Sequence, residues 1–412
     1  MIDQLPENRT LPGDVRLRAR RRLSEGMNPR PGTRTPLLIA AGVSLLAAGG
    51  VVAGQALYGG NAELAGPSYP YNGQFVGKDL TVVNHVERGT VNPDALARCV
   101  AAANEHPPAA EWQPIATSRR NGLTLTAFRS PAGVFFCANT ATTTTISAPA
   151  DTKLDQGARQ VKVLFTTPTG ALAGLASPDV RFLSLSRIGD NGWNNAEAAL
   201  VDGLFLAPSG YTKAENGSKA LVNGSDFALR GVPKPTPSVV DRPLPPADRS
   251  TPEAQKLAEC LRDRPVPDAD QFEVGVTAKV SAAGTLRLGR FGGVLLYCLD
   301  GGETLRGSAV EADDMGEFPA RTVAAISAFY DFVGSEAGGS QSSHMAAVGL
   351  VTDDRVASIT YTRPGTADVP ASISNGTFVL AAPFIDRHPD ARVVVRDATG
   401  KVLETIKPRD VP

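Results

Sequence analysis

Hydrophobic and polar residues alternate along much of the chain, and this alternation predicts β-strands. The segment "LTLTAFRS" (residues 123–130) alternates directly after Asn121-Gly122, a dipeptide typical of a two-residue hairpin turn. Other alternating or short apolar runs predict the remaining strands. They are "VFFCAN" (134–139), "FEVGVTAKV" (272–280), "TLRLGRF" (285–291), "VLLYCLD" (294–300) and the segments 180–187, 203–207, 226–230, 355–362, 376–381 and 392–406. Further turns are predicted at Gly292-Gly293 and, within the last segment, at Thr399-Gly400.

Two short segments follow a helical pattern instead. In "PDALARCVAAAN" (residues 93–104) apolar residues recur at the i, i+3, i+4, i+7 spacing of one helix face, namely Leu96, Cys99, Val100 and Ala103. Asn92 before Pro93 suits an N-cap followed by proline at the first helical position, and Thr251-Pro252 repeats this arrangement. The sequence therefore predicts an α+β fold of mainly antiparallel sheet, opened in each half by a short helix.

A repeat relates the two halves of the chain. The offset that places "LAECL" (257–261) on "LARCV" (96–100) also places Cys298 on Cys137. Further along the chain the offset becomes larger, and there "VGLVTDDRVASITYTR" (348–363) matches "AGLASPDVRFLSLSR" (173–187). The second copy therefore carries an insertion, expected within residues 315–341 and partly helical.

The repeat predicts two homologous extracellular domains, residues 78–230 and 252–408. Copies of about 155 residues are long enough for each to bury its own core. Between them, residues 231–251 contain six prolines. Such a composition predicts an extended, semi-rigid spacer between the domains.

The N-terminal region predicts a membrane anchor. Residues 36–58, "PLLIAAGVSLLAAGGVVAGQALY", have no ionisable group before Tyr58 and are long enough to span a bilayer as one helix. Arginines crowd the preceding arm, residues 1–35, which places the N-terminus in the cytoplasm and the bulk of the chain outside. Residues 59–77 are expected to form a stalk. A cleaved signal peptide, with Gly54 and Ala56 before the cut, is the alternative, but the apolar run and the basic arm are long for one.

The charge of the chain is unevenly distributed. The arm holds eight of the 41 basic side chains and four of the 42 acidic ones, so the rest of the chain holds 33 basic and 38 acidic side chains. A basic arm beside a span suits the positive-inside rule and anionic lipid head groups. We therefore expect a membrane partner with a single span and no nucleic-acid partner.

The four cysteines predict two disulfides. All of them follow the span, in an oxidising compartment where disulfides persist. Because each copy holds two cysteines at the same separation, we expect the pairs Cys99–Cys137 and Cys260–Cys298. A metal site would need closely spaced cysteine pairs, and a catalytic thiol would need a histidine partner.

No sequence motif indicates catalysis, a cofactor or a metal. His85, His106, His344 and His388 are scattered, and no nucleophile elbow, Walker loop or dinucleotide fingerprint is found. One ligand contact is predicted in the polar segment "IGDNGWNNAE" (residues 188–197), interpreted as a loop that exposes Trp193 between Asn191 and Asn194. The alternative is that Trp193 covers the edge of its own core.

The chain resembles exported, membrane-anchored proteins of high-GC, actinobacterial-type genomes. The features are 31 Arg against 10 Lys, the short arm "VRLRARRRLSEG" (residues 15–26) before one span, and the phrases "NGTFVLAAP" (375–383) and "VVVRDATGKVL" (393–403). The resemblance implies this layout and no particular activity. The leading hypothesis is a non-enzymatic extracellular binding or sensing module for a protein or cell-wall ligand. The alternatives are an envelope structural or signalling-accessory protein, such as a neighbour of a sigma-factor system, and an envelope hydrolase.

Overall fold

The computed structural model describes fourteen stretches of the chain. These are residues 63–65, 84–154, 161–189, 192–208, 218–222, 225–229, 231–262, 266–280, 284–300, 306–312, 315, 320–333, 342–381 and 390–407. The chain divides into two compact units, Met1–Gly50 and Val51–Pro412, and the first lies wholly outside the described residues. The predicted span, residues 36–58, lies outside them too. None of the helices in the described stretches has the length and apolar character that crossing a membrane requires.

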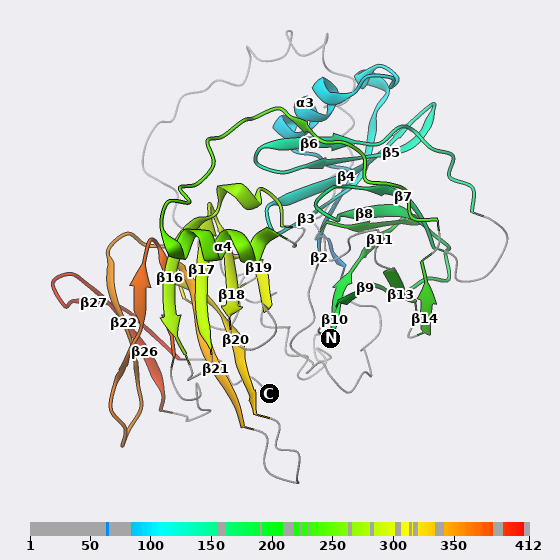
Figure 1. The fold of residues 1–412 in the computed structure, drawn as a ribbon. Helices are drawn as coiled ribbons and strands as arrows, with labels where there is room; N and C mark the ends of the chain where they lie inside the picture. Colours follow the sequence, from blue (N-terminus) through cyan, green and yellow to red (C-terminus); the bar gives the residue numbers. More distant parts are fainter. Residues whose placement is uncertain are drawn as a thin grey trace, which may run out of the picture. The chain divides into compact units, whose positions relative to one another are not determined.

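The first half of the second unit, residues 84–229, holds one helix and three antiparallel sheets within its described stretches (Figure 1). The helix is α3 (Pro93–Ala102), followed by a 3-10 turn at Ala109–Glu111. The strands are β2 (Asn84–Arg88), β3 (Gln113–Arg120), β4 (Leu123–Ser130), β5 (Gly133–Asn139), β6 (Thr143–Ile146), β7 (Val161–Thr166), β8 (Leu172–Ala176), β9 (Leu183–Gly189), β10 (Gly192–Glu197), β11 (Ala199–Val201), β12 (Leu204–Ala207), β13 (Ser218–Val222) and β14 (Ser225–Ala228).

The second half, residues 252–407, likewise shows one helix and three antiparallel sheets where it is described. The helix is α4 (Pro252–Arg262), followed by a 3-10 turn at Ala269–Gln271. The strands are β16 (Glu273–Lys279), β17 (Thr285–Phe291), β18 (Val294–Asp300), β19 (Arg306–Glu311), β20 (Val323–Val333), β21 (Ser342–Val351), β22 (Val356–Thr362), β23 (Val369–Pro370), β24 (Ser372–Ser374), β25 (Thr377–Leu380), β26 (Arg392–Asp397) and β27 (Val402–Ile406).

The two halves have the same strand order. In the first half the sheets run β3-β4-β5-β6, β11-β12-β8-β7 and β10-β9-β13-β14; in the second they run β16-β17-β18-β19, β24-β25-β21-β20 and β23-β22-β26-β27. Strands at the same position in the two lists therefore correspond to each other. The first half adds β2 beside β3, with β1 (Glu63–Ala65) on the far side of β2, and it adds β15 (Val239–Val240) beside β6. The described chain is thus mostly β-sheet with two helices.

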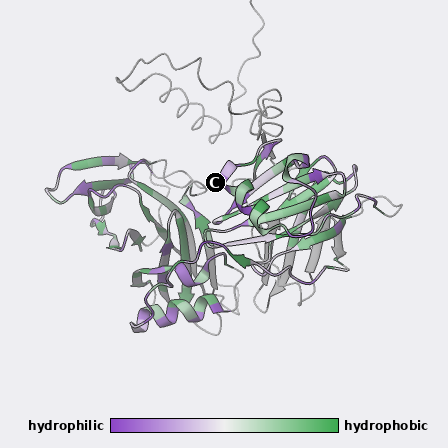
Figure 2. Ribbon diagram, turned by 90° about the horizontal axis from the view of Figure 1, so that it is seen from above, coloured by the Kyte–Doolittle hydropathy of each residue, from purple (hydrophilic) through white to green (hydrophobic). Residues whose placement is uncertain are grey.

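Each half packs its layers in the order helix, sheet, sheet, sheet, with a hydrophobic core between successive layers. In the first half, one core lies between α3 and the β3–β6 sheet, a second between that sheet and the sheet of β7 and β8, and a third between the latter and the sheet of β9. The second half repeats these three cores. Figure 2 shows hydrophobic residues along the strands and many of the hydrophilic ones on helices and loops. A middle sheet buried on both faces explains why β8, β12 and β25 are buried throughout.

The hairpins follow the local sequence. Asn121 and Gly122 both take positive φ angles, 51° and 79°, as a two-residue turn between β3 and β4 requires. Gly292-Gly293 makes the corresponding tight turn between β17 and β18.

Three expectations need correction. Residues 315–341 were expected to be partly helical, but Val323–Val333 is a strand, β20, paired with β21 in a hairpin longer than its counterpart β7–β8. Helix α3 buries Ala95 and Cys99, whereas Val100, expected on the buried face, is 38% exposed. The predicted spacer is not free of the first half, because it contributes strand β15 to that sheet.

Candidate functional site

Both disulfides pair cysteines within one half, as the repeat spacing predicts. Cys99 of α3 is bonded to Cys137 of β5, and Cys260 of α4 is bonded to Cys298 of β18. The Cα–Cα distances are 6.1 and 6.4 Å. Each bridge ties the opening helix to the third strand of the sheet that follows it, inside the core beneath that helix.

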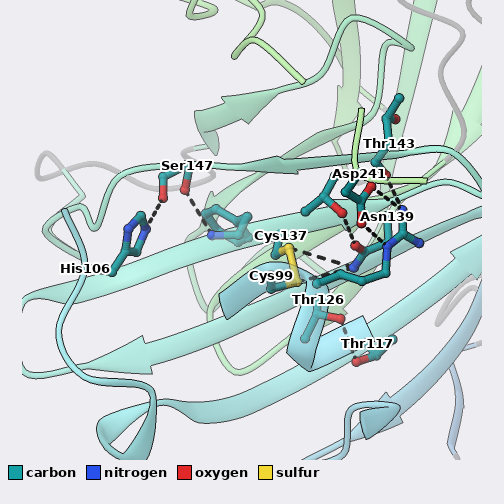
Figure 3. The surroundings of a disulfide bond; sticks show 12 residues. Cys99, His106, Thr117, Thr126, Cys137, Asn139, Thr143, Ser147 and Asp241 are labelled. Carbon is teal, nitrogen blue, oxygen red and sulfur yellow. Dashed lines mark hydrogen bonds and ion pairs between the residues drawn. A yellow bond between two sulfur atoms is a disulfide. The ribbon is translucent and has the colours of Figure 1, made fainter. Parts of the chain in front are cut away.

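A buried asparagine connects the first disulfide to the turn that follows β5 (Figure 3). The Asn139 amide Nδ2 donates to Cys99 Sγ at 3.3 Å and faces Cys137 Sγ at 3.8 Å. Its Oδ1 accepts from Thr144 Oγ1 at 2.7 Å. Asn139 therefore fixes the start of residues 140–143, which we call the Thr140 turn.

Arg98 of α3 binds two carbonyl groups of the Thr140 turn. Its Nη1 donates to the carbonyl of Thr140 at 2.7 Å, and its Nη2 donates to that of Thr143 at 3.0 Å. The same guanidinium makes a two-point contact with Asp241, with Nε–Oδ2 at 2.5 Å and Nη2–Oδ1 at 2.8 Å. The side chains of Arg98 and Asp241 are 9% and 20% exposed. The hydrogen bond from Arg98 is the main cause that lowers the pKa of Asp241, against the opposing effect of burial.

Asp241 belongs to a segment, residues 236–242, that is docked along the first half. The strand β15 pairs Val239 with Thr144 and Val240 with Thr143. The backbone N–H groups of Asp241 and Arg242 both donate to the carbonyl of Thr142, at 3.2 and 3.1 Å. We call this segment the strap.

Other contacts extend the docking to both ends of the strap. The Thr236 N–H donates to the Thr166 carbonyl at 2.8 Å, and the Ser238 and Thr145 hydroxyls lie 2.6 Å apart. Arg242 forms an exposed ion pair with Asp94 at the start of α3. The strap is thus an extended peptide bound to a sheet edge by backbone pairing and by one largely buried charge pair.

The hydroxyl and N–H groups of the Thr140 turn bind a carboxylate from the second half. Asp268 Oδ1 accepts from the hydroxyls of Thr140 and Thr142, at 2.7 and 2.5 Å, and from the N–H of Thr142 at 3.3 Å. Its Oδ2 accepts from the N–H of Ala141 at 2.8 Å. The turn thus presents two hydroxyls and two backbone N–H groups to one carboxylate.

Trp112 lies in the core beneath α3, and the half-buried His106 packs at the edge of this core. Trp112 is buried against Phe128 and Phe135, and its Nε1 donates to the Pro107 carbonyl at 2.9 Å. The His106 ring packs edge-on against Phe135, with Nε2 2.8 Å from the Ser147 carbonyl. Both residues therefore stabilise the core that holds the disulfide.

The residues predicted as a ligand contact are placed differently from expectation. Trp193 and Asn194 lie within strand β10, paired with Ile188 and Arg187 of β9, so the segment is a hairpin strand and not a loop. Asn191 lies outside the described residues.

Sequence reasoning did not identify the polar residues of the turn and the strap. Nothing in their spacing links Arg98, Asp241 and Asp268, which come from a helix, the linker and the second copy. Across the described stretches, no group of three or more His, Cys, Asp or Glu side chains is arranged to hold a metal ion. Comparisons with protein-family models, with curated proteins and with solved structures found no match.

Proposed function

We propose that the chain is a non-catalytic binding module made of two copies of one β-rich domain, exported and held at a membrane by residues 36–58. The common strand order of the halves and the matching disulfides support the duplication. Disulfides buried in each half support an oxidising, extracellular compartment. The ligand is an extended polypeptide.

The docked strap is the observation that carries this proposal. The edge of β6 already binds an extended segment through backbone pairing with Val239 and Val240, and Arg98 recognises the acid that follows. Strand addition of this kind is a common mode of peptide recognition, in which the backbone gives affinity and a side-chain pair gives specificity. The first half therefore holds a peptide-binding edge with its own ligand attached.

A peptide competition experiment on the full chain tests this proposal. The variant Asp241→Arg places two guanidinium groups together and weakens the strap, which exposes the edge. A fluorescent peptide with the sequence of residues 234–242 should bind this variant at least about tenfold more tightly than it binds the wild-type chain. The same peptide carrying Asp241→Arg should bind neither chain.

Two results would contradict the proposal. Equal binding of both peptides would show that Arg98 does not select the acid. No binding of the wild-type peptide to a variant whose strap amides exchange freely would show that the edge is not a peptide-binding site. Protease treatment of intact cells tests the topology separately, because we expect residues beyond the span to be digested without lysis.

A further inference from the structure

The Thr140 turn has the donors of an anion site, all of them neutral. Thr140 and Thr142 are buried, each 8% exposed. The Thr143 N–H donates to Thr140 Oγ1 at 3.0 Å, which orients this hydroxyl. Successive backbone N–H groups in a turn form a concave anion-binding nest, and here two hydroxyls extend it. The number and spacing of the donors fit a carboxylate.

The carboxylate that fills the nest is held in an unusual backbone conformation. Asp268 has φ 51° and ψ 40°, the left-handed region, directly before the 3-10 turn Ala269–Gln271. Aspartate tolerates this conformation better than most residues, but it is still less favourable than a right-handed one. The contacts with the nest offset this strain and fix the direction of the side chain.

The Thr140 turn and Asp268 each occur in one copy of the repeat and have no equivalent in the other. The offset that aligns the cysteines places Asp268 on Pro107, which has no carboxylate and whose ring excludes a positive φ. The same offset places Thr140, Ala141 and Thr142 on Gly301, Gly302 and Glu303, which supply no hydroxyl and add a negative charge. The nest belongs to the first copy and the acid to the second. The contact is therefore directional, because neither copy can make it with another of its own kind.

A second carboxylate of the second half binds the neighbouring hairpin turn. Glu311 Oε1 accepts from the Gly122 N–H at 2.6 Å, in the turn between β3 and β4. In an antiparallel sheet the β3–β4 and β5–β6 turns lie at the same end. Two turns at this end of the first sheet therefore present N–H groups to acids.

We propose that the Thr140 turn is a carboxylate-binding site, that Asp268 is the ligand by which the second half is held, and that an aspartate presented by another polypeptide can replace it. This site adjoins the β6 edge of the proposed function. The strap binds the Thr142 carbonyl, whereas Asp268 binds the hydroxyl and N–H groups of the turn. The carboxylate acceptor is charged and the donors of the nest are neutral, so each hydrogen bond is charge-assisted. Asparagine has the same shape but supplies only one acceptor and places N–H groups against donors.

Hydrogen exchange in the full chain tests whether Asp268 is the carboxylate bound by the Thr140 turn. The Ala141 N–H donates to Asp268, whereas the Thr143 N–H donates within the turn and reports its integrity. In Asp268→Asn we expect exchange at Ala141 to be at least about tenfold faster, with Thr143 unchanged. The control Asp270→Asn removes a carboxylate two residues further on, within the 3-10 turn, and should leave Ala141 as in the wild-type chain.

Addition of a peptide in trans tests the replacement. The probe is the amidated peptide of residues 266–272, "VPDADQF", added to Asp268→Asn at millimolar concentration. We expect it to restore slow exchange at Ala141, and the same peptide with Asp268→Asn to restore nothing. Unchanged exchange at Ala141 in Asp268→Asn would overturn the assignment of the ligand. If the two peptides had equal effects, or if neither had an effect, the proposal that the turn binds a carboxylate of another chain would be wrong.

Discussion

Gly174 and Phe205 face each other across strands β8 and β12, and Gly349 faces Phe378 in the same way across β21 and β25. A methyl group at Gly174 would meet the Lys162 carbonyl and the Phe205 ring, and one at Gly349 would meet the Ala324 carbonyl and the Phe378 ring. The phenylalanine ring covers the glycine of its neighbouring strand in both copies. This pairing explains why a glycine occupies the buried position opposite the phenylalanine in each copy.

Substitution of either glycine by alanine should destabilise the fold. Because a backbone carbonyl must move, we expect Gly174→Ala and Gly349→Ala each to lower the free energy of unfolding by about 1–3 kcal/mol. Denaturant titration measures the loss. Gly293→Ala is the control, because a methyl group there meets nothing within 4 Å. Equal losses for all three variants would refute the explanation.

The pair of Arg98 and Asp241 should contribute more to stability than the exposed pair of Arg242 and Asp94. We expect Asp241→Asn to cost roughly 2 kcal/mol, as for other hydrogen bonds to charged groups. We expect Asp94→Asn to cost clearly less, because water screens an exposed ion pair. Chemical denaturation of the two variants at pH 7 measures the difference. A larger loss for Asp94→Asn would contradict it.

The Arg98–Asp241 pair should make the free energy of unfolding depend on pH. The pKa of Asp241 is lowered in the folded chain, so its contribution is complete above the ordinary carboxyl pKa near 4 and disappears as pH falls through the lowered value. The stability difference between the wild-type chain and Asp241→Asn should therefore be constant from pH 7 to about pH 5 and shrink below about pH 4. A difference that grows in acid would contradict this assignment.

At the scale of elements, local patterns predict several of the hairpins. Asn121-Gly122, Gly292-Gly293 and Thr399-Gly400 each mark a turn where the chain does reverse between paired strands. The N-cap at Asn92 is formed as expected, since its side chain accepts from the Asp94 N–H at 2.9 Å. These features depend on residues close together in sequence, and sequence alone can therefore locate them.

Elements that depend on distant partners were not predictable in the same way. The strands β2 and β15 are short, and each is stabilised by an edge supplied by another part of the chain. The prolines around Val239 and Val240 indicate an extended segment but not the surface to which it binds. The alanine-rich run in β20 suits a helix by propensity, and its pairing with β21 overrides that preference.

Proline substitutions in β15 test whether the strap is held as a strand. We expect Val239→Pro with Val240→Pro to break the pairing with β6, because at least one ladder N–H is lost. Hydrogen exchange at the amides of Thr236, Asp241 and Arg242 should then become at least about tenfold faster. Leu244→Pro, which lies beyond β15, is the control and should leave these amides protected.

At the scale of the molecule, the two copies repeat one arrangement of layers but differ at their sheet edges. The first copy has β2 beside β3 and β15 beside β6, whereas β16 and β19 have no further strand beside them among the described residues. The turns of the first sheet accept polar contacts from the second copy, through Asp268 and Glu311. The repeat in the sequence could reveal the common architecture, but not these differences, because they arise from side chains outside the repeated pattern.

Each disulfide should stabilise its own half. A bridge that closes a loop of this size contributes roughly 4 kcal/mol in the chain-entropy model. We expect Cys99→Ser with Cys137→Ser to speed exchange in β4 and β5 while β17 and β18 keep their protection, and Cys260→Ser with Cys298→Ser to do the reverse. Each copy has its own three cores, so loss of one disulfide does not directly disturb the packing of the other copy. If either pair of substitutions loosened both halves equally, the copies would be one cooperative unit, held by contacts such as that of Asp268 with the Thr140 turn.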